Sequence, residues 1–339
     1  MYPYFRKLLF RLEPEQAHAL SLQMIRLVGS VPAGRAMLRA WFCGPLRPVK
    51  AFGLHFQNPI GLAAGYDKDG LGWRGLAGLG FGHIEIGTVT PEPQPGNPQP
   101  RLFRLSEQSA LINRMGFPGK GSQFVLAQLK GRRLPGLVLG VNLGKNRHTP
   151  NEEAARDYLY LYDLFAPVAD YLVINVSSPN TIGLRRLQAR DVLEQLLAAL
   201  ARQRLRQQAE SKRAVPILVK LAPDLAPEEL EDAVGAIQSA GMDGVIATNT
   251  TVARDGLPPE GLAREEGGLS GEPLRERSTQ VVRQIYKLVG NRLPIIGVGG
   301  ISNTAGVREK LDAGAVLVQL YTGMVYQGPG LVKRILEDL

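Results

Sequence analysis

The feature that most limits how this chain can fold is an alternation of short apolar runs and helical stretches, which begins near residue 58. Near-continuous runs of Val, Ile and Leu are typical of strands buried on both faces, as in parallel sheets. Eight strand–helix units over roughly 280 residues match a TIM (β/α)8 barrel, which we predict; a doubly wound open sheet is the alternative. The runs are 58–64, 83–89, 137–143, 171–177, 216–222, 244–250, 294–300 and 315–321.

The first 45 residues do not follow this repeat. Segments 2–12 and 14–31 have apolar residues at helical spacing, and the first has one apolar and one basic face. Such a helix could lie on a membrane surface or pack as a cap on the barrel, and the pattern favours neither. We therefore predict an N-terminal amphipathic helical extension over 1–45, followed by a barrel domain over 46–339.

Charge and cysteine content limit the partners and cofactors. Lys and Arg outnumber Asp and Glu by 40 to 31, which suits nucleic acid, anionic lipid or a phosphorylated ligand. Cys43 is the single cysteine, so an internal disulfide and a cysteine-based metal cage are excluded, and no metal is predicted. No apolar run reaches the roughly 18 to 20 residues of a membrane span, and the N-terminus does not have a signal-peptide pattern.

Polar residues gather just after the predicted strands, which is where the catalytic sites of this fold lie. Glycines follow the seventh and eighth runs, in PIIGVGGI (294–301) and LVQLYTG (317–323). Backbone N–H groups of such loops bind phosphate in many barrels, although a tight turn would also need glycine. Both loops therefore favour a phosphate site at one end of the barrel.

Two lysines lie at positions where a barrel has few of them. Lys68 follows the first run, and Lys220 lies within the fifth. A lysine in an apolar strand needs a partner or a task that uses its charge. Three roles are open: stabilising a reduced flavin near its N1–C2 edge, forming a Schiff base, or extending an ammonium group to solvent as a structural residue.

Amides and hydroxyls make up the rest of the predicted pocket. Several neutral amides would offer a planar ligand alternating donors and acceptors, although a single Asn is more commonly a turn residue. Ser177 and Ser178 end the fourth run, and none of the four histidines lies beside them in sequence to serve as a base. The hydroxyl could instead move a proton, or cap a helix. The amide and threonine candidates are Asn113, Asn142, Asn175, Asn180, Asn249, Thr248 and Thr250.

Together these motifs resemble the dihydroorotate dehydrogenases, specifically their membrane-associated, quinone-reducing class. The matching stretches run in order from NPIGLAAGYDKDG (58–70) through INVSSPNT (174–181) to LVQLYTG. The resemblance implies a flavin mononucleotide (FMN) enzyme that oxidises dihydroorotate to orotate in de novo pyrimidine biosynthesis. It also implies that Ser178 removes a proton from C5 while hydride leaves C6 for the flavin; soluble members have cysteine at that position.

The resemblance assigns residues to three sites. Substrate contacts are expected from Lys68, Asn113, Arg114, Met115, Gly116, Phe117, Asn175, Asn180, Asn249 and Thr250. Cofactor contacts are expected from Ala64, Gly65, Tyr66, Asp67, Lys68, Thr88, Asn142, Asn175, Lys220, Thr248, Gly271, Gly300, Tyr321 and Thr322. A tunnel for a membrane quinone, between the N-terminal helices and the barrel, is expected to be lined by His18, Arg104 and Tyr321.

The resemblance also implies a monomer on the cytoplasmic side of the cell membrane, bound peripherally, with anionic lipid and a membrane quinone as partners and without nucleic acid. Tyr66, Pro118 and Ile182 depart from the family pattern. The alternative is another TIM-barrel flavoenzyme, such as a dihydrouridine synthase acting on RNA. A dihydropyrimidine-type dehydrogenase needs iron–sulfur cysteines, and a phosphoribosyl-ligand binding module needs neither a strand-end serine nor two lysines.

Overall fold

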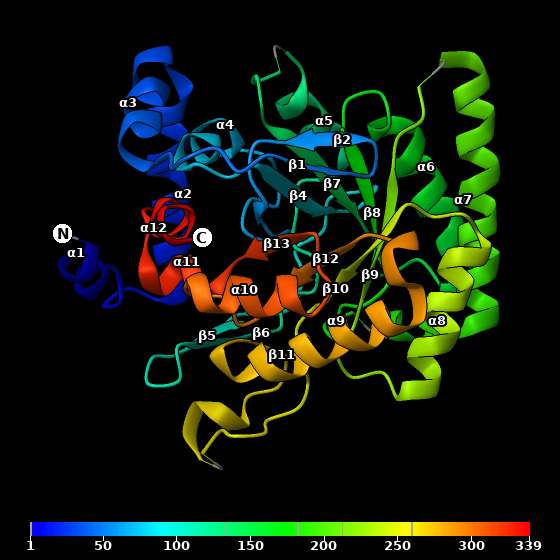
Figure 1. Cartoon of the computed structure of the whole chain (residues 1–339). Helices are drawn as coiled ribbons and strands as arrows, with labels where there is room; N and C mark the ends of the chain where they lie inside the picture. The colour runs from blue at the N-terminus through cyan, green and yellow to red at the C-terminus, as the bar shows by residue number, and fades with distance from the viewer. Residues whose placement is uncertain (1, 132, 182, 212, 259) are drawn as a thin grey trace.

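A closed barrel of eight parallel strands forms the centre of the computed structural model, which describes residues 2–131, 133–181, 183–211, 213–258 and 260–339 (Figure 1). The order around the barrel is β10-β12-β13-β3-β4-β7-β8-β9. Each predicted apolar run contains one of these strands, so the TIM barrel is confirmed. The strands are β3 (Ile60–Leu62), β4 (His83–Val89), β7 (Val138–Leu143), β8 (Tyr171–Asn175), β9 (Ile217–Leu221), β10 (Gly244–Ala247), β12 (Ile295–Val298) and β13 (Leu317–Leu320).

Helices surround the barrel because the outward side chains of its strands are apolar and need a second layer to cover them. Ile217, Val219 and Val245, for example, are fully buried in the core shared by strands and helices. These helices are α4 (Trp73–Leu76), α5 (Ser122–Leu129), α6 (Ala154–Phe165), α7 (Arg190–Ser211), α8 (Pro227–Ser239), α9 (Arg275–Val289), α10 (Thr304–Asp312), α11 (Thr322–Gln327) and α12 (Leu331–Asp338).

A hairpin of β1 (Val49–Ala51) and β2 (Leu54–Phe56) closes the end of the barrel where the strands begin. Phe56 is buried in a second apolar cluster together with Tyr171 and Leu218 from the barrel strands. Gly244 leaves room for the ring of Phe52, because a Cβ there would lie 2.4 Å from that ring. The strand-start end is therefore filled with side chains, which leaves the other end for a site.

The N-terminal extension contains three helices, α1 (Tyr2–Leu9), α2 (Pro14–Ser30) and α3 (Pro32–Phe42). The spacing of apolar residues predicts the first two helices and does not predict the third. Two glycines allow α2 to cross α4 closely: a Cβ on Gly29 would lie 2.3 Å from Cα of Gly75. The extension lies beside α11 and α12 (Figure 1), and Arg6 donates to the backbone oxygen of Tyr326 at 2.7 Å.

A separate three-stranded antiparallel sheet contains β5 (Leu102–Leu105), β6 (Ala110–Asn113) and β11 (Gly268–Gly271), in the order β11-β6-β5. The apolar-run argument did not predict this sheet. It matters for function because Asn113 ends β6 and Gly271 ends β11, and both residues reach the pocket described below. Within the described ranges, no helix is both long and apolar enough to cross a membrane.

Candidate active site

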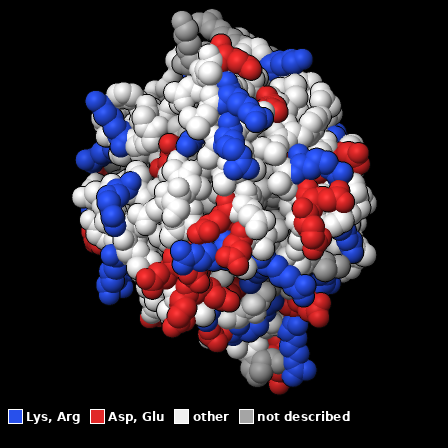
Figure 2. Space-filling view, turned by 90° about the vertical axis from the view of Figure 1, so that its right-hand side faces the viewer, with Lys and Arg blue, Asp and Glu red and all other residues white. Residues whose placement is uncertain are grey.

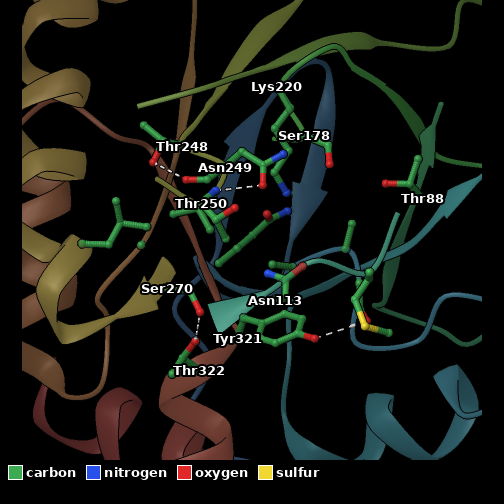
Figure 3. Close-up of a pocket in the computed structure, with 18 of the residues that line it drawn as sticks. Thr88, Asn113, Ser178, Lys220, Thr248, Asn249, Thr250, Ser270, Tyr321 and Thr322 are labelled. Atoms are coloured by element: carbon green, nitrogen blue, oxygen red, sulfur yellow. Dashed lines mark hydrogen bonds between the residues drawn. The ribbon is translucent and has the colours of Figure 1, made fainter. Parts of the chain in front are cut away.

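A pocket opens at the ends of the barrel strands, with an empty volume of about 1030 Å³ that includes its open mouth. Figure 3 shows side chains from separate strands and loops gathered around this one space. Most of the predicted substrate and cofactor residues line it. They are Ala64, Gly65, Lys68, Thr88, Asn113, Met115, Gly116, Phe117, Asn175, Ser178, Asn180, Lys220, Thr248, Asn249, Thr250, Gly271, Gly300, Tyr321 and Thr322.

A network of amides and a hydroxyl forms the polar floor of this pocket. Asn175, at the end of β8, donates to Oγ1 of Thr88 at 2.9 Å and to Oδ1 of Asn142 at 3.1 Å. Thr88 in turn donates to Oδ1 of Asn142 at 2.5 Å. Because each group is buried and bonded, the floor is held in one arrangement, as buried polar groups require. Asn142 lies beneath the lining residues as their support.

A buried ion pair lies at the same depth. Lys220 Nζ is 3.6 Å from a carboxylate oxygen of Glu85, whose side chain is fully buried. Asn142 and Gln319 each donate to that carboxylate at 2.7 Å. Two hydrogen bonds and a counter-charge compensate the desolvation of Glu85. The carboxylate of Glu85 faces Nζ of Lys220, so this geometry supports a charge-handling role for Lys220 over a Schiff base.

The two serines at the end of β8 have different surroundings. Ser177 donates from Oγ to Oδ1 of Asn175 at 3.1 Å, and Nδ2 of Asn249 donates to the same Oγ at 3.0 Å. Ser178 lines the pocket instead, and its Oγ accepts a bond from the Asn180 N–H at 3.3 Å. Asn180 also donates to Oδ1 of Asn113 at 3.0 Å. The hydroxyl of Ser178 therefore faces the pocket, with amides on both sides of it.

The glycine loops form a second, opposite part of the pocket. Gly271 has φ +96°, and a Cβ there would lie 2.3 Å from the backbone oxygen of Ser109; Gly300, with φ +71°, would clash equally with Arg275. Ser270 and Thr322 place their hydroxyl oxygens 2.8 Å apart at the edge of these loops. Backbone N–H groups and hydroxyls at a site without large side chains are suited to a phosphate group.

Lys68 donates to the backbone oxygen of Gly65 at 2.8 Å, and burial lowers the pKa of its ammonium. Asp67, beside it, does not line the pocket. Its carboxylate accepts the backbone N–H groups of Leu71 and Gly72, each at 2.8 Å, and burial raises its pKa to about 6. Asp67 therefore holds the loop that carries Lys68.

Arg114, Tyr66 and Asn142 also lie outside the pocket lining. Arg114 points away and forms an ion pair with Glu265 at 2.5 Å. Tyr66 faces a second cavity, and Asn142 supports the floor.

The second cavity has an empty volume of about 1060 Å³, which also includes its open mouth, and it lies between α1, α2 and the barrel with mainly apolar walls. His18, Arg104 and Tyr321 all line it, as does Tyr66. The ring of Tyr66 contacts His18 edge-on at 4.9 Å and Tyr321 at 5.9 Å, measured between ring centres. Burial lowers the pKa of His18 to about 4, so its imidazole is neutral at pH 7. Tyr321 lines both cavities and thus separates the two.

The family model described as dihydroorotate dehydrogenase matches residues 47–339. The chain belongs to the dihydroorotate dehydrogenase family. Two similar relatives are named dihydroorotate dehydrogenase (quinone): one from Anaeromyxobacter sp. (strain Fw109-5) is 50% identical, over 100% of this chain and 92% of the relative. The other, from Aeromonas hydrophila, is 49% identical over 100% of both chains. A crystal structure of the dihydroorotate dehydrogenase of Eimeria tenella in complex with ferulenol superposes with a TM-score of 0.88 at 37% identity, covering 96% of this chain and 90% of that one.

Two of the three departures from the family pattern lie at the cavities. Pro118 lines the first pocket, next to Phe117, which has a positive φ of 53°. Tyr66 lines the second cavity. Ile182 lies outside the described residues.

Two residues were missed from the sequence: Glu85, which pairs with the buried Lys220, and Gln319, which donates to Glu85. The signal for Glu85 was available: it is an acid within an apolar run, as Lys220 is a base within another. Each buried charge implies a partner, and the two together predict a pair.

Proposed function

We propose that this chain oxidises dihydroorotate to orotate in de novo pyrimidine biosynthesis, using FMN as cofactor and a membrane quinone as electron acceptor. The observation that carries the proposal is the pocket at the strand ends, where two serines, five side-chain amides and two lysines surround one space. Relatives with the same activity in their names match the chain over its whole length, which supports the same reading.

The residues of the pocket fit FMN. The amide oxygens and nitrogens of the floor match the donors and acceptors of a flavin ring. Oε1 of Gln319 is buried at the pocket and has no protein partner among the described residues, so it can accept a hydrogen bond from a ligand. Lys220 supplies a positive charge, and the glycine loops at Gly271 and Gly300 suit the phosphate. When bound there, FMN would supply the redox chemistry that links dihydroorotate to quinone.

Ser178 is the base of this proposal. Its Oγ faces the pocket and accepts the Asn180 N–H, so a lone pair is left to take the C5 proton of the substrate while the hydroxyl passes its own proton to solvent water. Asn113 and Asn180 are bonded to one another beside it, and Asn249 lies across from them. These amides orient the pyrimidine ring, and Lys68 balances the charge of its carboxylate.

The second cavity is the quinone site of this proposal. Its apolar walls suit a hydrophobic quinone, and it reaches Tyr321, which also borders the flavin pocket. His18 and Arg104 supply polar groups within a mainly apolar cavity. Arg104 lies over the ring of Phe10 at 4.5 Å, which holds the guanidinium at the cavity wall.

We place membrane contact on the extension, with the chain as a monomer bound peripherally on the cytoplasmic side. Large apolar side chains are exposed there, among them Tyr4, Leu8 and Trp41, with exposed fractions of 77%, 60% and 63%. Figure 2 shows the α7 side of the barrel, where Lys and Arg are interspersed with Asp and Glu. The basic excess of the chain favours an anionic lipid surface.

An anaerobic absorption experiment tests the proposed function. The purified protein is expected to show flavin bands that dihydroorotate bleaches and that a soluble quinone then restores. Bleaching that requires RNA, with no response to dihydroorotate, would instead support the dihydrouridine synthase alternative. A protein without flavin bands, and with none after incubation with FMN, would contradict both readings.

A further inference from the structure

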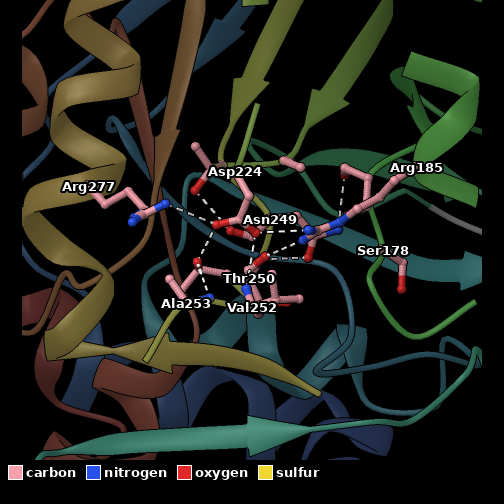
Figure 4. Close-up of polar contacts among 12 residues, drawn as sticks. Ser178, Arg185, Asp224, Asn249, Thr250, Val252, Ala253 and Arg277 are labelled. Carbon is pink, nitrogen blue, oxygen red and sulfur yellow. Dashed lines mark hydrogen bonds and ion pairs between the residues drawn. The ribbon is translucent and has the colours of Figure 1, made fainter. Parts of the chain in front are cut away.

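Outside the pocket, the loops after three neighbouring strands meet at one carboxylate (Figure 4). Asp224, in the loop after β9, accepts the backbone N–H of Val252 at 3.0 Å and the hydroxyl of Thr251, both from the loop after β10. It also accepts Nη1 of Arg185 at 2.8 Å and Nη1 of Arg277 at 3.3 Å. Its oxygens are therefore shared among four donors from three separate segments.

Arg185 lies in a short helix, η3 (Leu184–Gln188), that follows the serine loop. Its guanidinium makes three bonds in different directions: Nη1 to Asp224, Nε to the backbone oxygen of Ser177 at 3.2 Å, and Nη2 to the backbone oxygen of Thr250 at 2.9 Å. The planar fork of an arginine fixes the angles among its partners, which a lysine cannot do. Arg185 thus fixes the loop after β8 to the loop after β10.

The two bonded carbonyls are next to the groups that face the pocket. The oxygen of Ser177 belongs to the peptide unit that leads into Ser178, and Thr250 itself lines the pocket beside Asn249. Neither Arg185 nor Asp224 lines the pocket. A shift of Arg185 would consequently move Ser178 relative to the substrate-binding amides without removing any group from the site.

We propose that Arg185, held by Asp224, is a positioning residue that sets the place of the Ser178 hydroxyl relative to the substrate. This inference rests on the proposed function, because it presumes that Ser178 takes the proton from C5. Proton transfer depends steeply on geometry, and a displacement of about 1 Å can cost about a hundredfold in rate. A lysine at position 185 would keep the charge opposite Asp224 and lose the fixed fork.

A double-mutant cycle separates this role from a general contribution to folding. The variants are Arg185→Lys, Ser178→Ala and the double variant, each purified with bound flavin. The measurement is the anaerobic rate of flavin reduction at saturating dihydroorotate, together with flavin content and the midpoint of thermal unfolding. Asp224→Asn is a second, milder variant, because it weakens the acceptor that holds Arg185.

We expect Arg185→Lys to slow flavin reduction by at least about tenfold in the wild-type background. In the Ser178→Ala background the same change should alter the residual rate by less than about twofold, because no hydroxyl is left to be positioned. Asp224→Asn should slow flavin reduction by a smaller factor when Ser178 is present, and it should likewise change the residual rate little in the Ser178→Ala background. Flavin content is expected to stay at the wild-type level.

Arg204→Lys is the matched control. Arg204 lies on α7 and pairs with Asp243 at 2.6 Å near the start of β10, at the end of the barrel away from the pocket. This control should leave flavin reduction unchanged. If Arg185→Lys slowed flavin reduction equally in both backgrounds, the positioning role of Arg185 would be overturned, whereas the proposed role of Ser178 as base would stand. A Ser178→Ala variant that reduces flavin at the wild-type rate would overturn the proposed base and the inference together.

Discussion

The asparagine side chains at the strand ends form hydrogen bonds with one another, and most of them also face the pocket. Sequence analysis grouped five of them around one ligand, and four line the pocket. Asn142 does not, because the strand register places it opposite Val173, two residues before Asn175 on β8. It therefore lies one layer deeper in the barrel and supports Asn175 from below. Residue type was predictable from the motif, whereas depth in the barrel depends on a register that the sequence does not state.

His83 is a buried residue that stands outside both cavities and gives a pH prediction. Its ring packs edge-on to Phe56 at 5.4 Å, and neither ring nitrogen has a hydrogen-bond partner among the described residues. Burial lowers its pKa to about 3. The unfolded chain, with a pKa near 6.5, therefore binds a proton between pH 6.5 and 3 that the folded protein does not. The contribution of His83 to stability is thus lost as the pH falls through this window.

We expect His83→Phe to remove this pH dependence while keeping a ring in the same space. From pH 6.5 to pH 5 the free energy of unfolding should fall by about 1.5 kcal/mol less in the variant than in the wild type. Urea denaturation at the two pH values measures this difference, and His55→Phe, at an exposed position, is the control for replacing a histidine with phenylalanine. If the free energy of unfolding fell by the same amount in His83→Phe and in the wild type, the His83 imidazole would take up its proton in the folded protein as readily as in the unfolded chain.

Among the elements, the N-terminal extension was predicted to be helical, but only two of its three helices were predicted. The spacing of apolar residues gave α1 and α2 within a few residues, but α3, which also carries exposed apolar side chains, was not predicted. The close crossing at Gly29 and Gly75 depends on contacts between two segments far apart in sequence. For the same reason the sheet of β5, β6 and β11 was missed, since β11 joins β6 from more than 150 residues away.

The exposed apolar residues of the extension lead to a prediction about membranes. Replacing Tyr4, Leu8 and Trp41 with serine should weaken binding to anionic phospholipid vesicles by at least about tenfold, because each side chain would otherwise leave water on binding. Vesicle sedimentation measures this, and flavin reduction by dihydroorotate should be unchanged. Leu205→Ser is the control, since Leu205 is 64% exposed on α7. Equal vesicle binding by the triple variant and the control would place the membrane surface elsewhere.

At the scale of the whole molecule, two cavities share one wall. The barrel mouth holds the polar pocket, the extension covers the apolar cavity, and Tyr321 borders both. The rhythm of apolar runs was enough to predict the barrel, and the family resemblance named most of the residues that line the pocket at its mouth. The shared wall could not be predicted from the spacing of apolar residues, because it requires α1 to lie against α11, more than 300 residues away in the chain. This arrangement predicts that substrate oxidation and quinone reduction can be impaired separately.

The most direct test of the account is a single-turnover measurement of both half-reactions in Ser178→Ala, with Ser177→Ala as the neighbouring control. Loss of the Ser178 hydroxyl should slow flavin reduction by dihydroorotate at least about a hundredfold, the scale of a general base. Reoxidation of the reduced protein by quinone should stay at the wild-type rate, since the second cavity is untouched. Ser177→Ala should have the smaller effect on reduction, because its hydroxyl supports Asn175 and Asn249 and does not line the pocket. Flavin reduction at the wild-type rate in Ser178→Ala would contradict the central claim.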